Sequence, residues 1–141
     1  MHGPAIWRAL LAFTADRDVA SDAFSEAFAR ALAQGDTIRD PLRWVWRVAF
    51  RIAAGDLKER RSQVELTGTG PTYPFPEPLV HVFEALHELS PNQRLAVVLH
   101  DYADRPVSEV AATIGASRAT VYVHLSQGRK RLRALLEEDD A

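Results

Sequence analysis

The chain has 141 residues, 47% of them hydrophobic, with 17 basic against 19 acidic side chains and no cysteine. This composition is typical of a globular protein, and the lack of cysteine excludes disulfides, thiol nucleophiles and cysteine-based zinc sites. There is neither a secretory signal nor the apolar run of about 18 residues that a spanning helix needs, so we expect a cytoplasmic protein without membrane insertion.

The charges are sorted along the chain, although the net charge is only −2. Residues 37–61 hold seven basic and three acidic residues, and residues 117–133 hold five basic residues and no acidic one. Between them, residues 62–116 carry two basic and seven acidic residues. Two basic blocks indicate two surfaces that face a polyanion, although solvated helix faces give the same pattern about as often.

The segment from Val19 to Ala33 predicts a helix. Its apolar residues recur every four positions, which is the spacing of one packed helix face. They are Ala20, Phe24, Phe28 and Leu32, with alanines alongside. The polar side carries Asp22, Glu26 and Arg30, and Gly35 is expected to end the helix.

A second helix is expected from Pro41 to Arg61, after a cap at Asp40. Its apolar set is Trp44, Val45, Val48, Ile52 and Leu57. Trp44 and Trp46 are two positions apart and cannot face the same way on a helix. We expect Trp44 to be buried and Trp46 or Arg47 to lie nearer the surface.

Residues 62–79 form a linker on this interpretation. Four of the eight prolines and two of the seven glycines fall in these eighteen positions, so neither regular helix nor sheet is expected there. Prolines at this density keep a segment extended and semi-rigid. The linker therefore allows its flanking domains to occupy separate positions on a larger partner.

Helical spacing returns from Asn92 to Ala103, after a capping Ser90 and a first-turn Pro91. The residues Asp104 to Pro106 break the chain. A short helix is then expected from Val107, closed by Gly115.

The strongest motif is a helix-turn-helix in VSEVAATIGASRATVYVHLSQGRKRLRALL, from Val107 to Leu136. Ala111 is small where the second helix approaches, Gly115 can adopt a left-handed conformation, and Ser117 can cap the next helix. The shared core is expected to consist of Val110, Ile114, Val121 and Leu125.

The second helix of this motif carries candidate DNA-binding residues. Its exposed start, which would enter a major groove, is Arg118, Ala119, Thr120, Tyr122 and His124. Behind it, the side chains expected to hold phosphates are Arg129, Lys130, Arg131 and Arg133. The alternative is a helical hairpin that never touches nucleic acid, and the basic block weighs against it.

These elements predict an all-α fold of two small helical domains joined by a Pro/Gly-rich linker. The N-terminal domain is residues 1–61, the linker residues 62–79, and the C-terminal domain, with the helix-turn-helix, residues 80–141. The five histidines form neither an HExxH motif nor an i, i+4 pair. We expect no metal site, no cofactor and no catalysis by this chain.

The segment from Ala85 to Leu136 resembles the promoter-binding fourth region of extracytoplasmic-function (ECF) sigma factors, dissociable subunits of bacterial RNA polymerase. DAFSEAFARAL, Asp22 to Leu32, resembles a helix of that family's second region, and PLRWVWRVAFRIAAGDLKERR, Pro41 to Arg61, resembles its promoter-melting helix. The blocks occur in the family's order. The resemblance implies core RNA polymerase and promoter DNA as partners and leaves an anti-sigma factor open.

Site residues follow from the resemblance. The helix that carries Asp22 would dock on core polymerase through Asp22, Phe24 and Glu26. The melting helix would contact displaced bases and backbone, because rings stack on bases and arginines follow phosphates. Its candidate residues are Arg43, Trp46, Arg47, Arg51 and Lys58.

The chain also departs from the family pattern. About fifteen residues of the family's first helix are missing before Ile6, so we expect either an upstream start or a reduced second region. The recognition helix has Tyr122, His124 and Gln127 where the family often has arginine. We therefore expect weak DNA binding by the chain alone, with a salt slope of about −3.6 for about four neutralised phosphates.

Two other functions remain open on the sequence. A stand-alone helix-turn-helix regulator would bind DNA without polymerase. A sigma-like adaptor would keep the polymerase contact but would have lost promoter reading.

Overall fold

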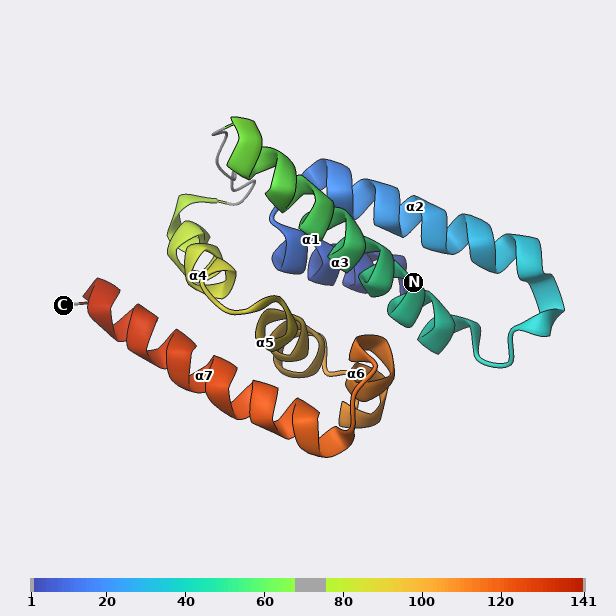
Figure 1. The fold of residues 1–141 in the computed structure, drawn as a ribbon. Helices are drawn as coiled ribbons and strands as arrows, with labels where there is room; N and C mark the ends of the chain where they lie inside the picture. Colours follow the sequence, from blue (N-terminus) through green and yellow to red (C-terminus); the bar gives the residue numbers. More distant parts are fainter. Residues whose placement is uncertain (1, 68–75, 141) are drawn as a thin grey trace. The chain divides into compact units, whose positions relative to one another are not determined.

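The computed structural model describes residues 2–67 and 76–140 (Figure 1). All regular structure in these two ranges is helical, which confirms the predicted all-α class. The chain divides into two compact units, Met1–Thr72 and Tyr73–Ala141.

The first unit packs three helices against one another: α1 (Gly3–Thr14), α2 (Arg17–Gln34) and α3 (Pro41–Thr67). A single 3-10 turn, η1 (Gly35–Thr37), follows α2. The largest fully buried side chains here are Ile6, Leu10, Phe13 and Phe50. No helix is predicted from the sequence for the first fourteen residues, yet α1 supplies three of these four side chains.

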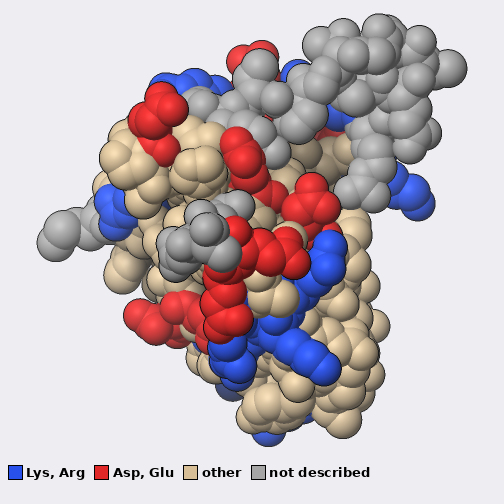
Figure 2. Space-filling view, turned by 90° about the vertical axis from the view of Figure 1, so that its left-hand side faces the viewer, with Lys and Arg blue, Asp and Glu red and all other residues tan. Residues whose placement is uncertain are grey.

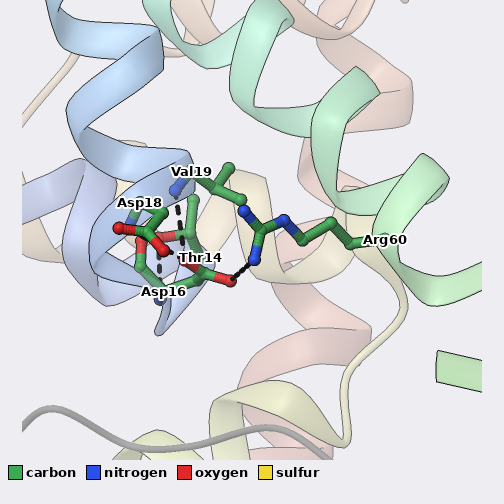
Figure 3. A network of polar contacts seen from close by, with 5 residues as sticks. All are labelled: Thr14, Asp16, Asp18, Val19 and Arg60. Carbon is green, nitrogen blue, oxygen red and sulfur yellow. Dashed lines mark hydrogen bonds and ion pairs between the residues drawn. The ribbon is translucent and has the colours of Figure 1, made fainter. Parts of the chain in front are cut away.

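Asp16 holds the sharp turn between α1 and α2 (Figure 3). Its Oδ1 accepts hydrogen bonds from the backbone N–H groups of Asp18 and Val19, at 2.9 and 3.1 Å. This is the geometry of a helix N-cap, which satisfies backbone donors that the first turn leaves unpaired. The predicted helix over residues 19–33 therefore starts two residues earlier, at Arg17, and Gly35 ends it as expected.

The packed face of α2 differs from the predicted stripe. Its buried residues are Val19, Ala20, Ala23 and Ala27. Phe24 and Phe28 are half-buried, and Leu32 is 82% exposed, so the expectation that Leu32 packs is wrong. Ala20, Ala23 and Ala27, at positions i, i+3 and i+7, form the packed face, because small side chains let neighbouring helices approach closely.

Helix α3 is longer than predicted. Asp40 caps it through a hydrogen bond from the Arg43 backbone N–H at 3.2 Å, as expected. The helix continues to Thr67 and α4 begins at Glu77, so the prediction that residues 62–79 hold no regular helix is wrong at both ends. The reason lies in the sequence: no proline or glycine occurs between residues 62 and 67, and a proline is tolerated in a helix's first turn.

The burial of the two tryptophans is the reverse of the prediction. Trp46 is only 5% exposed and stacks on Phe50, with ring centroids 5.9 Å apart and planes 16° apart. Trp44 and Arg47 are half-buried. The buried stripe is Val45, Trp46, Ala49, Phe50 and Ala53, about one position away from the expected set. This stripe packs against α1 and α2, and Phe13 of α1 lies against Phe50 with ring centroids 5.6 Å apart.

The second unit is built around one long helix, α7 (Arg118–Asp140). It contacts α4 (Glu77–His87), α5 (Pro91–Ala96), the π-helix η2 (Val97–Tyr102) and α6 (Val107–Ile114). The largest fully buried side chains are Val98, Leu99, Val110, Val121 and Leu125.

The predicted helix from Asn92 to Ala103 changes its hydrogen-bond register halfway. It begins as expected, with Ser90 and Gln93 forming a reciprocal capping box. After Ala96 the backbone adopts the wider π geometry, in which the Ala103 N–H reaches the carbonyl oxygen of Val98 at 3.0 Å. Such turns are short and frequent at functional sites.

Candidate nucleic-acid interface

The turn between α6 and α7 has the geometry that the sequence predicts. Gly115 ends α6 with φ of 80°, a left-handed conformation that costs glycine little. Its N–H and that of Ala116 both donate to the carbonyl oxygen of Ala111, at 2.8 and 3.0 Å. Ser117 Oγ then accepts from the Thr120 backbone N–H at 3.2 Å and caps α7. Residues 107–140 therefore form two helices around a tight bend.

The two helices share an apolar core. Val110, Val121 and Leu125 are at most 1% exposed, and Ala111 is 8% exposed where α7 packs against α6. Ile114 is half-buried and therefore contributes only part of its side chain, less than expected. This packing fixes which face of α7 is turned away from the unit.

The start of α7 presents its candidate residues to solvent. Arg118, Ala119 and Thr120 are exposed, and Tyr122 is 59% exposed. His124 is half-buried, and its Nδ1 is shielded from solvent without a hydrogen bond to any described residue. The structure therefore gathers four of the five groove candidates on an open surface and turns His124 partly inward.

Arg129, one of the expected phosphate contacts, already has an anionic partner. Its Nε and Nη2 donate to Oδ2 and Oδ1 of Asp101, at 2.9 and 2.6 Å. These hydrogen bonds from the guanidinium raise the pKa of Arg129 above its usual value, against a smaller opposing effect of burial. Asp101 comes from η2, 28 residues earlier, and no local sequence pattern connects the two positions.

The remaining cations of α7 are open to solvent. Lys130, Arg131 and Arg133 are all exposed. Basic and acidic side chains both appear on the face of the structure drawn in Figure 2. The exposure of these three cations leaves each of them as a separate candidate phosphate contact.

Helix α3 carries a second row of basic residues. Arg43, Arg51 and Lys58 are exposed and Arg47 is half-buried. Their spacing of four, four and seven residues keeps all four within about 80° of arc, at about 100° per residue. Trp46, which was expected on this surface, lies in the core instead.

The candidate docking residues of α2 do not all share a face. Asp22 and Glu26 are exposed and one helical turn apart, and Glu26 pairs with Arg30 at 2.8 Å. Phe24 lies two positions from each, about 200° around the helix. It is half-buried against Trp7, with centroids 6.1 Å apart. The structure therefore brings the two carboxylates together and separates Phe24 from them.

Within residues 2–67 and 76–140, no three His, Cys, Asp or Glu side chains are grouped to hold a metal ion. Among the helices that the structure describes, none is long and apolar enough to cross a membrane.

Comparisons with known proteins agree with this geometry. Residues 81–132 match the family model of sigma-70, region 4. The ECF RNA polymerase sigma factor SigJ of Mycobacterium tuberculosis (strain ATCC 25618 / H37Rv) is 33% identical over 115 residues, which cover 69% of this chain. The chain spans only 36% of the length of SigJ.

Two solved structures have the same fold. The sigma factor RpoE, co-crystallised with the anti-sigma factor NepR from Bartonella quintana, superposes with a TM-score of 0.77 at 20% identity, over 96% of this chain and 91% of RpoE. CnrH, solved in complex with the cytosolic domain of CnrY, superposes with a TM-score of 0.73 at 25% identity, over 98% of this chain and 84% of CnrH.

These findings define the class: residues 81–132 are a sigma-70 region 4 domain. More particularly, the chain is a homologue of the ECF sigma factors of RNA polymerase, as the sequence motifs predict.

Proposed function

We propose that this chain is a sigma factor that binds core RNA polymerase in the cytoplasm and directs it to promoters. The observation that carries the proposal is the open start of α7, where Arg118 and Tyr122 follow a capped bend inside the region 4 match. An arginine there can bind a guanine edge through two hydrogen bonds, and the neighbouring cations can hold phosphates.

The proposed mechanism is positioning. The helix-turn-helix holds duplex DNA upstream, while the basic row on α3, from Arg43 to Lys58, follows the backbone of the melted strand. Asp22 and Glu26 on α2 offer an acidic surface to core polymerase. Nucleotide addition belongs to the polymerase in this scheme.

An anti-sigma factor is a proposed further partner. RpoE and CnrH were each solved in complex with a second protein, and the partner of RpoE, NepR, is an anti-sigma factor. The likeness in fold extends over almost the whole chain, which supports a protein partner of this kind here.

A polymerase adaptor without promoter reading is the second candidate. Two observations favour it: Trp46 is buried and Arg129 is engaged by Asp101, so each basic helix offers fewer DNA-binding groups than its sequence suggests. Polymerase docking through α2 depends on neither residue.

Run-off transcription with core polymerase and a library of upstream sequences separates these functions. Promoter-specific initiation that depends on this chain supports the sigma factor. Co-purification with core polymerase without specific initiation would replace it by the adaptor. DNA binding as a dimer, with no affinity for polymerase, would replace both by a stand-alone regulator.

A further inference from the structure

The contact between Asp101 and Arg129 ties the π-helix η2 to the helix that carries the candidate DNA-binding residues. Two parallel N–H groups of Arg129 face the two oxygens of one carboxylate. Arginine holds a phosphate with the same planar fork. Asp101 therefore occupies an edge of the guanidinium that a DNA phosphate would otherwise use.

Helix periodicity places Arg129 on the same face of α7 as Arg118 and Tyr122. Tyr122 and Arg129 follow Arg118 by 4 and 11 positions, which rotates them by about 40° and about 20° from it. Arg129 lies about 16 Å further along the helix axis than Arg118. All three residues are exposed, so duplex DNA docked on Arg118 and Tyr122 would pass beside Arg129.

We propose that Asp101 is an internal competitor for Arg129, which lowers the DNA affinity of the helix-turn-helix by withholding one phosphate-binding cation. The proposal rests on the DNA-binding function proposed above and names the residue that tunes it. In the wild-type chain, the region 4 domain then neutralises one phosphate fewer than its basic residues would allow.

The pair is placed where such competition is effective. The side chains of Arg129 and Asp101 are 46% and 35% exposed, so solvent and a passing phosphate can both reach them. The pair is bidentate, which is the geometry in which a partly exposed ion pair persists, so Asp101 holds Arg129 while no DNA is bound. The carboxylate is always present at the site, whereas a phosphate arrives only with DNA.

The test compares two variants that change the charge equally. Asp101→Asn removes the competing carboxylate while keeping its shape. Asp104→Asn is the matched control, because Asp104 is exposed and makes no ion pair with the described residues. Asn also tolerates the positive φ of 56° at position 104. Binding of full-length chains to a fluorescent non-specific duplex is measured by anisotropy between about 50 and about 200 mM salt.

The expected result is a difference in salt dependence. The plot of log affinity against log salt should be steeper by about 0.9 for Asp101→Asn than for Asp104→Asn, because one more phosphate is neutralised. The ratio of the two affinities should therefore rise about 3.5-fold as salt falls over that range. In an Arg129→Gln background, the two variants should bind equally.

Two results would overturn the inference. Equal slopes for the two variants would mean that Arg129 does not meet the DNA. Weaker binding by Asp101→Asn than by its control would mean that Asp101 positions Arg129 for a phosphate instead of competing for it. If Asp101→Asn does not fold, as judged by circular dichroism, Asp101→Ser repeats the comparison.

Arg118→Ala separates failure of this inference from failure of the proposed function. If Arg118→Ala weakens DNA binding while Asp101→Asn and Asp104→Asn have the same salt slope, only the competitor role of Asp101 is refuted. If Arg118→Ala leaves DNA affinity unchanged, the docking face of α7 is wrong and the proposed function is overturned together with the inference.

Discussion

Asp16 and Arg60 are 44 residues apart in the sequence, yet Nη1 of Arg60 donates to Oδ2 of Asp16 at 3.0 Å. The other oxygen of the same carboxylate caps α2 (Figure 3). One side chain therefore fixes the turn between α1 and α2 and attaches it to α3.

Substitutions at Asp16 should separate its two roles. Asp16→Ala removes both the cap and the ion pair, and we expect it to lower the free energy of unfolding by about 1–2 kcal/mol. Asp16→Asn keeps a capping oxygen and should cost less than about 1 kcal/mol, as should Arg60→Ala, because the pair is partly exposed. Urea unfolding of the three variants measures this. Equal losses for Asp16→Ala and Asp16→Asn would show that the cap contributes nothing.

Replacement by alanine should change the free energy of unfolding in opposite directions at two helical glycines. A Cβ at Gly55 meets no atom within 4 Å, so Gly55→Ala should stabilise α3 by about 0.5–1 kcal/mol through helix propensity. A Cβ at Gly128 would lie 3.0 Å from Cγ2 of Val97, which is buried and cannot move far. Gly128→Ala should therefore lower the free energy of unfolding by about 1 kcal/mol, because the clash outweighs the gain in helix propensity.

The double variant isolates the clash at Gly128. In a Val97→Ala background the obstructing methyl is gone, so Gly128→Ala should become stabilising by about 1 kcal/mol. Chemical denaturation monitored by circular dichroism gives each free energy. If Gly128→Ala stays destabilising in that background, the contact with Val97 is not its cause.

The features predicted correctly from the sequence are those set by neighbouring residues. Asp40, Ser90, Gly115 and Ser117 end or begin helices as expected, because caps and left-handed turns depend on short-range chemistry. The π geometry of η2 has no comparable local signature. It was therefore predicted as ordinary helix.

Two of the errors arose where distant residues decide the outcome. Trp46 and Phe50 are four positions apart on α3 and share a face, and Phe13 of α1 packs against that face. Without α1, the sequence does not tell which of the two tryptophans is buried. Arg129 looks like a free cation until Asp101 is brought beside it from another helix. Tertiary contacts of this kind leave no pattern within one segment, so spacing alone does not reveal them.

Burial of Trp46 should appear in both stability and function. Trp46→Ala should cost about 3–5 kcal/mol of unfolding free energy, as expected for a large buried ring, whereas half-buried Trp44→Ala should cost clearly less. Trp46→Phe keeps an apolar ring against Phe50 and should retain promoter opening, measured by permanganate reactivity of the melted strand. If a folded Trp46→Phe chain no longer opens the promoter, Trp46 contacts DNA and is not only a core residue.

Arg118 and Lys130 should affect DNA binding differently. Arg118→Ala removes a base-edge candidate and should weaken promoter binding about tenfold, relaxing sequence preference at one position. Lys130→Ala removes a phosphate candidate, so it should weaken binding to all duplexes alike and make the salt slope less negative by about 0.9. With Arg129 engaged by Asp101, we expect a wild-type slope of about −2.7 instead of the −3.6 or so that four available cations would give.

Titration of specific and scrambled duplexes over a range of salt concentrations tests both substitutions. Arg133→Ala serves as the companion to Lys130→Ala, because it also removes one exposed cation of α7. The assignment is wrong if Lys130→Ala reduces the preference for the specific duplex, or if Arg118→Ala weakens binding to both duplexes equally.

The paired carboxylates of α2 should govern binding to core polymerase. Asp22→Lys reverses an exposed charge on the proposed docking face and should weaken the complex at least tenfold, because like charges at an interface repel. Glu26→Gln is the milder change at the second position, chosen because a lysine there would repel Arg30 one turn away. The double variant should abolish co-purification with core polymerase, while its circular dichroism spectrum stays that of the wild type. Glu84→Lys, an exposed reversal in the other unit, is the control for charge alone. If Glu84→Lys weakens polymerase binding as much as Asp22→Lys does, the effect comes from net charge and the face of α2 is not the docking surface.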